Sequence, residues 1–439
     1  MSKFRFYAGE TAGRPYRCDF WNRFSSTQRK GILLIASFVR NLRDLPSSLT
    51  PSAILSGLLV IVIGYASSLV IVFQAASAAG LSPDQISSWV LAITLGSGVC
   101  SIVMSLMFRM PATAAWSTPG VALLVTSIAN YAYTEAIGAY IIASIASIIL
   151  GISGLFGRVM SLIPQPVVLG MLAGILIRFG FGLFNALPDR PLIVLPMIVI
   201  YFVLRRINFR APAAIALIIG LGIALLAGDI DTSQSIALSV AAPLLTVPTF
   251  TINALLGIAL PLFALALTGQ YAPGQAVLRG SGYQPPIDKA LIVTGLGSLI
   301  GAPFGGHGVT LAAITAALVT NPDAHPDPDK RYSAGVAAGF WYIITGIFGA
   351  GIVNLFAALP AALIAATAGL GLTSAILSSL AGSMADVKGR EGALVALMCT
   401  AANFSLLGIG APFWGLVFGV LVNWIMTQPV TQNWFKKEA

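Results

Sequence analysis

Three long segments of this sequence contain no Asp, Glu, Lys or Arg: residues 232–278, 332–385 and 392–435. A helix needs roughly 20 apolar residues to cross a bilayer, so each segment has room for two spans. Across the chain 57% of residues are hydrophobic and 9% are charged, whereas a soluble domain carries about a quarter charged residues. The sequence therefore predicts an all-α membrane protein and excludes a soluble globular fold.

Hydropathy and helix breakers predict fourteen transmembrane segments. Their expected ranges are 54–78, 86–108, 112–128, 135–155, 166–184, 192–204, 211–227, 251–271, 290–302, 304–319, 332–353, 360–380, 392–407 and 412–426. The first 50 residues precede them as a basic tail, in which the apolar run 32–39 is too short to span. We expect part of this tail to form an amphipathic piece on the membrane surface.

The distribution of basic residues gives an orientation to these segments. With a cytoplasmic N-terminus, 22 of the 24 Lys and Arg residues fall on the cytoplasmic side, which is the positive-inside pattern. Arg190 is the one basic residue in a predicted outer loop, and Arg178 lies within a span. Loop charges of this kind indicate an inner-membrane protein with both termini cytoplasmic, and they argue against nucleic-acid binding despite the net charge of +9.

The third and tenth predicted spans begin in the same unusual way. Residues 112–124 and 302–314 both open with a stretch rich in Pro, Gly and small residues, with helices expected from Pro119 and from near Gly308. The tenth span comes seven after the third, and because seven is odd the second half would enter the membrane in the opposite sense to the first. The halves would then be inverted repeats with broken spans at a midplane site. Opposed helix N-termini there would favour an anion. The alternative is a pair of glycine-rich kinks that serve only close packing.

The residues at these breaks resemble a known family. The segments 64–74, 115–120, 171–180, 302–308 and 324–329 are similar to those of the benzoate/proton symporter family, and the resemblance extends over roughly 51–427. It implies the seven-plus-seven fold shared with nucleobase and sulfate-type carriers, in which a core domain moves against a gate domain. Nucleobase carriers have acidic residues on spans eight and ten, where this chain has Gln270 and His307. A nucleobase substrate is therefore not expected.

The resemblance divides the chain into six parts: tails at 1–50 and 429–439, core segments at 51–160 and 231–354, and gate segments at 161–230 and 355–428. It implies a substrate site between the third and tenth spans, flanked by the first and eighth. The residues that we expect to line it are Trp116, Ser117, Thr118, Gly120, Phe304, Gly305, Gly306, His307, Gly308, Gln74, Gln270 and Tyr271. Hydroxyls and amides suit a carboxylate, and Trp116 and Phe304 could wall an aromatic ring.

Two ionisable residues lie within predicted spans. His307 is the expected proton-coupling group, because a histidine titrates near neutral pH; the alternative is a neutral histidine bonded within an irregular backbone. Arg178 would cost ~3 kcal/mol at the bilayer centre, so it either snorkels to the interface or contacts the substrate.

Proton-coupled symport of benzoate or a similar aromatic carboxylate is the expected function. A passive anion channel or uniporter of this fold, or a carrier of another small organic anion, remains the alternative. No P-loop, nucleophile elbow or zinc-protease pattern appears, so an enzyme is not expected. No metal or cofactor is expected besides the coupled proton, the bilayer is the surrounding partner, and a homodimer is left open.

Overall fold

The computed structural model describes residues 36–209, 212–230, 239–312, 315–407 and 409–427. These residues form a mostly helical membrane protein. In the first half the elements are α2 (Pro51–Gly64), η1 (Tyr65–Leu69), α3 (Val70–Ala78), α4 (Pro83–Phe108), β1 (Ala114–Trp116), α5 (Thr118–Ser127), η2 (Ile128–Asn130), α6 (Tyr133–Ser153), α7 (Phe156–Leu162), α8 (Gln165–Asn185), α9 (Pro191–Arg206) and α10 (Pro212–Leu226).

The remaining elements lie in the second half of the chain. It contains α11 (Ile252–Ala254), η3 (Leu255–Ala259), α12 (Leu260–Ala266), η4 (Leu267–Tyr271), α13 (Ala272–Gly280), α14 (Ile287–Gly301), η5 (Ala302–Phe304), β2 (Val309–Leu311), α15 (Ala316–Thr320), η6 (Pro328–Lys330), α16 (Tyr332–Ile347), α17 (Gly349–Ala357), α18 (Ala361–Ala385), α19 (Arg390–Ala402), β3 (Ser405–Leu406), β4 (Ile409–Gly410) and α20 (Ala411–Thr427).

Long apolar helices dominate the described part of the chain. Six of its helical segments are long and apolar enough to cross a membrane, or seven if the helix Ala36–Ser48 and α2, which meet at a bend of 107°, count as one span. Local sequence signals begin these helices: Ser82 and Gln85 form a capping box at the start of α4, where Pro83 occupies the first turn. Each of the fourteen predicted segments contains at least one helix, but the number of membrane crossings remains a prediction.

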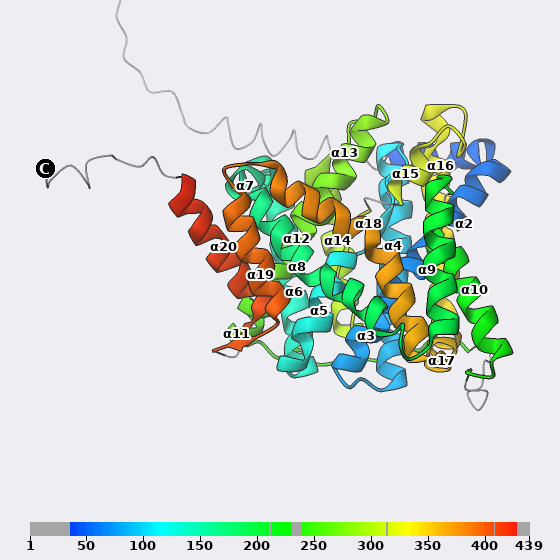
Figure 1. Cartoon of the computed structure of the whole chain (residues 1–439). Helices are drawn as coiled ribbons and strands as arrows, with labels where there is room; N and C mark the ends of the chain where they lie inside the picture. Colours follow the sequence, from blue (N-terminus) through cyan, green and yellow to red (C-terminus); the bar gives the residue numbers. More distant parts are fainter. Residues whose placement is uncertain (1–35, 210–211, 231–238, 313–314, 408, 428–439) are drawn as a thin grey trace, which may run out of the picture.

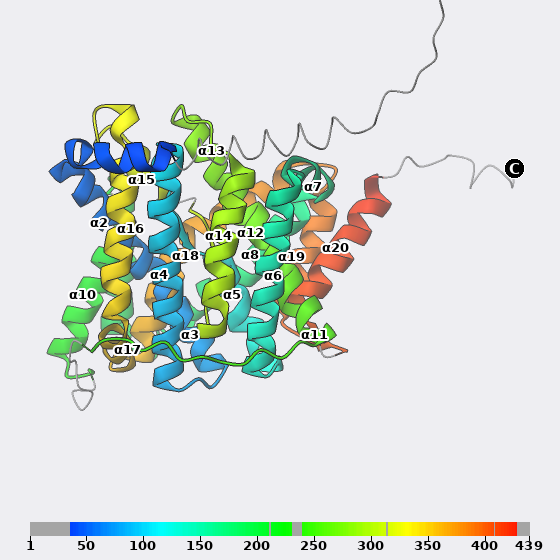
Figure 2. The same ribbon diagram turned by 180° about the vertical axis from the view of Figure 1, so that it is seen from behind.

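The helices pack in two groups. In one group α4 packs on α16 and α14, α6 packs on α14, and α2 packs on α16. Figure 2 shows α4, α6, α14 and α16 in front. In the other, α8 packs on α18 and α19, α19 packs on α20, and α9 packs on α10; these lie toward the viewer in Figure 1. Buried side chains from α2, α3, α5, α8 and α18 join the groups in one apolar core.

Two details of the sequence prediction need correction. The fold is not entirely α-helical, since β1 pairs with β2 and β3 pairs with β4 in two short antiparallel ladders. The helix expected from near Gly308 does not begin there: Gly308 has φ +133°, β2 follows at once, and α15 begins only at Ala316. The backbone hydrogen bonds that β2 makes with β1 favour an extended chain over a helical one at this point. The helix expected from Pro119 does begin there, within the first turn of α5.

The helix Ala36–Ser48 lies across the ends of α4 and α16 (Figure 2). Asn41 on this helix donates from Nδ2 to the carbonyl oxygen of Leu106 at 2.7 Å, and the Tyr332 hydroxyl donates to the Asn41 carbonyl oxygen at 3.0 Å. Arg109 completes the contact by donating to Asn41 at 2.6 Å and to Asp44 at 2.9 Å. The described end of the predicted tail is therefore a helix fixed to the bundle, while residues 1–35 lie outside the described part.

Candidate functional site

The two predicted breaks lie side by side. In the antiparallel ladder, Ala115 on β1 faces Thr310 on β2. The ladder continues beyond both strands, because the Ser117 N–H donates to the Gly308 carbonyl at 3.1 Å and the Ala312 N–H donates to the Thr113 carbonyl at 2.9 Å. The N–H and C=O groups of an extended segment have no partners within a helix, and here the hydrogen bonds between the two extended segments satisfy them. The ladder therefore joins the third and tenth predicted spans directly.

One serine from each half of the chain holds an edge of this ladder. Ser101 on α4 accepts from the Ala114 N–H at 2.8 Å, and Ser298 on α14 accepts from the Val309 N–H at 2.8 Å. Each hydroxyl in turn donates to a carbonyl one turn back in its own helix, at 2.7 and 2.8 Å. The two edges of the ladder are thus fixed by the same arrangement of hydrogen bonds, one from each half of the chain.

Two π-helical turns flank the ladder. η1 interrupts the helix that runs from α2 to α3, and η4 interrupts the helix that runs from α12 to α13. A π-turn inserts one residue into a helix and is frequent at functional sites. Ser68 lies in η1 and Gln270 in η4, and both line the same small cavity beside the ladder.

This central cavity has a volume of about 40 Å³. Its lining residues are Ile63, Gly64, Ser68, Ala115, Trp116, Thr118, Gln270, Ala312, Thr315 and Tyr342. None of them carries a formal charge, so any carboxylate held here would be bound by neutral hydrogen-bond donors. The Trp116 Nε1 and the Tyr342 hydroxyl are buried donors with no hydrogen-bond partner among the described residues. Buried polar groups are usually paired, so two unpaired donors beside one cavity point to a ligand.

Aromatic rings shape one wall of this cavity. The Trp116 ring makes edge contacts with Tyr342 and with Tyr65, at centroid distances of 5.8 and 5.7 Å. Such T-shaped contacts fix the plane of the indole ring. The cavity therefore combines a fixed aromatic face with hydrogen-bond donors.

His307 lies behind the ladder rather than in the central cavity. It lines a second cavity of about 30 Å³ together with Ser117, Tyr271 and Gly308. Trp89 Nε1 donates to His307 Nδ1 at 2.9 Å, which leaves the proton on Nε2, and Nε2 lies 3.2 Å from the Ser117 carbonyl oxygen. The imidazole is thus a neutral bridge between α4 and the N-terminus of α5. Its expected role as proton carrier stays a prediction. A proton on Nδ1 would occupy the position that now accepts from Trp89, so protonation must break that hydrogen bond.

Several predicted site residues have other partners in the structure. The Ser117 hydroxyl accepts from the Gly120 N–H at 3.1 Å and caps α5, so these two groups satisfy each other. The Tyr271 hydroxyl bonds to the Thr294 hydroxyl at 2.5 Å. Gly305 has φ +97°, which favours glycine, and the Gly306 N–H donates to the Gly301 carbonyl at 3.0 Å. These residues build the turn and helix ends around the ladder.

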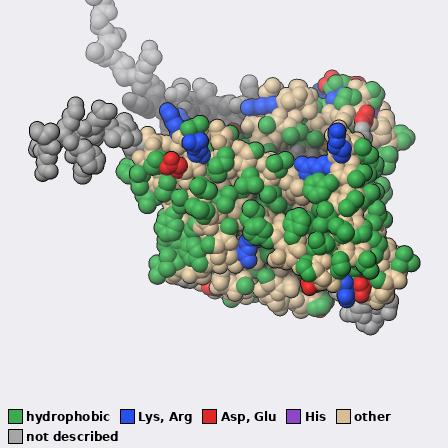
Figure 3. Space-filling model, in the orientation of Figure 1, with side chains coloured by type: hydrophobic (Ala, Val, Ile, Leu, Met, Phe, Trp, Pro, Cys, Tyr) green, Lys and Arg blue, Asp and Glu red, His purple; other side chains and the backbone are tan. Residues whose placement is uncertain are grey.

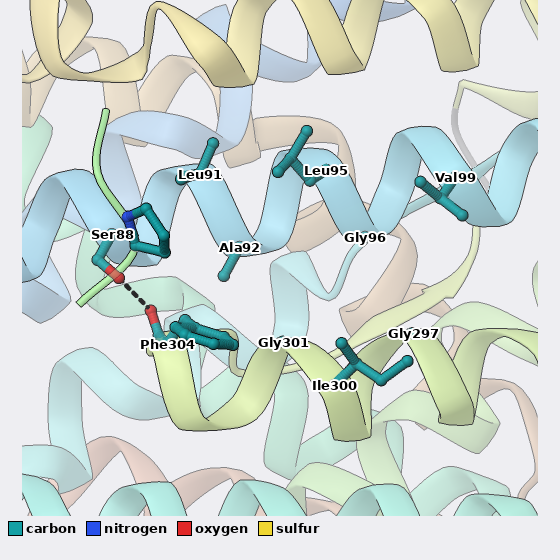
Figure 4. Close-up of a pocket in the computed structure, with 11 residues that line it drawn as sticks. Ser88, Leu91, Ala92, Leu95, Gly96, Val99, Gly297, Ile300, Gly301 and Phe304 are labelled. Carbon is teal, nitrogen blue, oxygen red and sulfur yellow. Dashed lines mark hydrogen bonds between the residues drawn. The ribbon is translucent and has the colours of Figure 1, made fainter. Parts of the chain in front are cut away.

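Phe304 and Gln74 lie apart from the central cavity. Phe304 lines an apolar groove of about 380 Å³ between α4 and α14, and its carbonyl oxygen accepts from the Ser88 hydroxyl at 3.0 Å (Figure 4). Ser88 is the one hydroxyl residue among the groove's lining side chains, so the groove offers little to a carboxylate. Gln74 lines a different cavity with Arg178. Of the twelve predicted residues, the central cavity collects Trp116, Thr118 and Gln270.

Sequence reasoning missed Tyr342, Ser68 and Thr315 as lining residues of the central cavity. Ser68 lies within segment 64–74, which carries part of the family resemblance, so the resemblance could have identified it as a candidate. A tyrosine in an apolar span has no distinguishing pattern, and only the packing of α16 on α2 turns Tyr342 toward the ladder.

Comparison with known proteins assigns the chain to a family. Residues 47–425 match the model of the benzoate membrane transport protein family. The chain belongs to this family. It is 39% identical over 388 residues to the benzoate membrane transport protein of Acinetobacter baylyi, covering 88% of this chain and 98% of that one. It is 40% identical over 372 residues to the inner membrane protein YdcO of Escherichia coli, covering 85% and 95% of the two chains. The chain is thus a membrane transport protein.

Solved structures support the fold. The transmembrane domain of the cyanobacterial bicarbonate transporter BicA aligns with a TM-score of 0.58 at 18% identity, covering 84% of this chain and 97% of that one. The structure of SLC26A9 aligns with a TM-score of 0.63 at 12% identity, covering 97% and 72%. At these identities the likeness shows a common fold and nothing about substrate.

Proposed function

We propose that this protein is a secondary transporter that carries benzoate or a similar aromatic carboxylate together with a proton across the inner membrane. The observation that carries the proposal is the central cavity, in which unpaired buried donors and a fixed indole ring meet at the crossing of the two broken spans. Membership of the benzoate transport family supports the substrate class. A proton that accompanies the anion makes the loaded site closer to neutral, which lowers the cost of moving it through a low-dielectric interior.

We further propose that the fourteen predicted segments form two inverted repeats of seven. Three matching features support this: the Ser101 and Ser298 bonds to the ladder, the π-turns η1 and η4, and the helix pairs α4 with α16 and α14 with α6. In such a repeat α4 corresponds to α14 and α16 corresponds to α6. The contact between α4 and α16 is then the counterpart of the contact between α14 and α6. In Figure 3 most of the visible Lys and Arg side chains lie along the edge where α7 and α13 end, which supports a cytoplasmic face there.

The two groups of packed helices support the expected division into core and gate. Core segments 51–160 and 231–354 contain α4, α6, α14 and α16, and gate segments 161–230 and 355–428 contain α8, α18, α19 and α20. A central cavity of about 40 Å³ holds little more than a water molecule, whose share of liquid volume is about 30 Å³. The core and gate must therefore separate before an aromatic carboxylate enters, as alternating access requires.

Uptake into proteoliposomes tests this function. With an imposed inward proton gradient, the protein is expected to accumulate labelled benzoate above its external concentration, and an uncoupler is expected to abolish the accumulation. Liposomes without protein give the background, because benzoic acid itself crosses lipid. Equilibration without accumulation would instead identify a passive uniporter or channel. This is the second candidate because no acidic side chain is among the described residues that line the central cavity.

Replacing Tyr342 with phenylalanine tests the cavity as the binding site. The change removes one unpaired buried donor and leaves the ring contact with Trp116. We expect the KM for benzoate to rise about tenfold, which corresponds to the loss of one hydrogen bond to a charged group, worth ~1.5 kcal/mol. Tyr201→Phe is the matched control, because Tyr201 bonds Arg205 on α9 away from the ladder. An unchanged KM in Tyr342→Phe would remove this residue from the site.

A further inference from the structure

A third cavity, which is lined by polar and apolar residues, lies between the helices α3 and α5 on one side and α8 and α18 on the other, away from the ladder. It has a volume of about 170 Å³, larger than the central cavity. Its lining residues are Gln74 on α3, Val125 and Thr126 on α5, Arg178, Phe179 and Gly182 on α8, and Ala365 on α18. It therefore lies where helices of the proposed core meet helices of the proposed gate.

Arg178 gives this cavity its charge. Its Nη1 is buried and has no hydrogen-bond acceptor among the described residues, and the described chain contains no carboxylate in ion-pair contact with it. An arginine at membrane depth is expensive and normally has a partner. A guanidinium presents paired donors that match a carboxylate, so an organic anion is the partner that fits.

The neighbouring groups are also suited to an anion. The described residues include no hydrogen-bond partner for the Gln74 amide, and Thr126 contributes a hydroxyl that bonds the Leu123 carbonyl of its own helix at 2.8 Å. Among the described residues, no acidic side chain lines the cavity to compete for the arginine.

The cavity lies toward one end of the bundle. Thr126 is in the last turn of α5, Gln74 is one turn before the end of α3, and Arg178 is two turns before the end of α8. Ala365 is in the second turn of α18. These helix ends lie opposite the ends of α7 and α13 in Figures 1 and 2. They are on the outer side in the orientation proposed above.

We infer that this cavity is an outer carboxylate-binding station, where Arg178 captures the substrate anion before it reaches the ladder. The inference rests on the proposed function and adds a second binding position to it. Because the central cavity is lined by uncharged residues, Arg178 supplies the fixed positive charge that draws an anion into the core–gate interface.

Protection of an introduced thiol tests the station without relying on transport. Gly182 lines the cavity, and a Cβ added there meets no atom within 4 Å, so Gly182→Cys is accommodated. In a background with Cys18, Cys100 and Cys399 replaced, we expect benzoate to slow labelling of the Gly182→Cys thiol by a methanethiosulfonate at least fivefold. The protection should vanish when Arg178→Gln is added. Gly157→Cys on α7, which also meets no atom within 4 Å, is the control and should show no protection.

Uptake measured on the same variants separates this inference from the proposed function. Protection that requires Arg178, with uptake of benzoate by the parent protein, supports the station. Uptake without protection overturns the station and leaves the transport function intact. Protection that persists in Arg178→Gln overturns the role of the arginine. Absence of both uptake and protection overturns the proposed function together with the station.

Discussion

Replacing His307 with glutamine is expected to abolish proton-driven accumulation of benzoate while leaving exchange of benzoate across the membrane. A glutamine can reproduce both bonds of the neutral imidazole, since its carbonyl oxygen accepts from Trp89 and its amide donates to the Ser117 carbonyl. It cannot take up a proton. Because the substitution keeps the bridge and removes the titration, it isolates the coupling role from the structural one.

The physical basis of this coupling lies in the bond from Trp89. When Nδ1 gains a proton it can no longer accept from the Trp89 N–H, so α4 and the ladder lose one of their links. An anion in the nearby cavity favours the protonated imidazole, and the protonated imidazole favours the anion, which makes the two bind together. Substrate and proton are then loaded as a pair, as symport requires.

Counterflow and accumulation are the measurements that separate the outcomes. Preloaded vesicles report exchange, and vesicles with an imposed proton gradient report accumulation. His307→Leu, which removes both bonds, is the structural comparison and is expected to lose both activities. If His307→Gln accumulates benzoate like the parent protein, His307 is a structural bridge and the proton is carried by another group, such as the substrate carboxylate itself.

The sequence predicts a helix in each of the fourteen segments and a break at the start of the third and tenth, but it places the helix after the second break near Gly308, whereas α15 begins at Ala316. Charge-free segments and basic loops identify helices because a bilayer imposes a length and a composition on them. The Pro and Gly residues of the third and tenth spans predict openings that are not helical, and the structure has two paired extended strands there.

The side chains that face the cavity were harder to predict, because their direction depends on the helix turns beside them. A π-turn adds one residue to a helical turn, so every residue after it points in a different direction than a regular helix would give. In the helices from α2 to α3 and from α12 to α13, the period of 3.6 residues therefore does not predict which side chains face the cavity. Gln270 therefore lines the central cavity while Tyr271 faces His307 and Thr294. The sequence predicts Phe304 at the substrate, but with the turn at Gly305 its side chain lines the apolar groove between α4 and α14 instead.

Replacing Gly339 with leucine is expected to prevent the two helices at the centre of the proposed core from packing. α4 and α16 cross where Gly98 and Gly339 face each other: a Cβ on Gly339 would lie 2.6 Å from the Gly98 carbonyl oxygen, and a Cβ on Gly98 would lie 2.7 Å from the Gly339 carbonyl oxygen. Backbone oxygens cannot move aside as flexible side chains do. Small residues at such crossings let helix backbones approach closely in membranes, where packing rather than water drives association.

The expected cost of Gly339→Leu is at least about 3 kcal/mol in the free energy of unfolding, the upper part of the range for overpacked cores. We expect most of the protein to be lost from the monodisperse peak after detergent extraction, and the remainder to melt at a lower temperature than the parent. Gly222→Leu on α10 is the matched control, because a Cβ at Gly222 meets no atom within 4 Å, and it should behave like the parent. A Gly339→Leu protein as stable as this control would mean that α4 and α16 do not cross at these glycines.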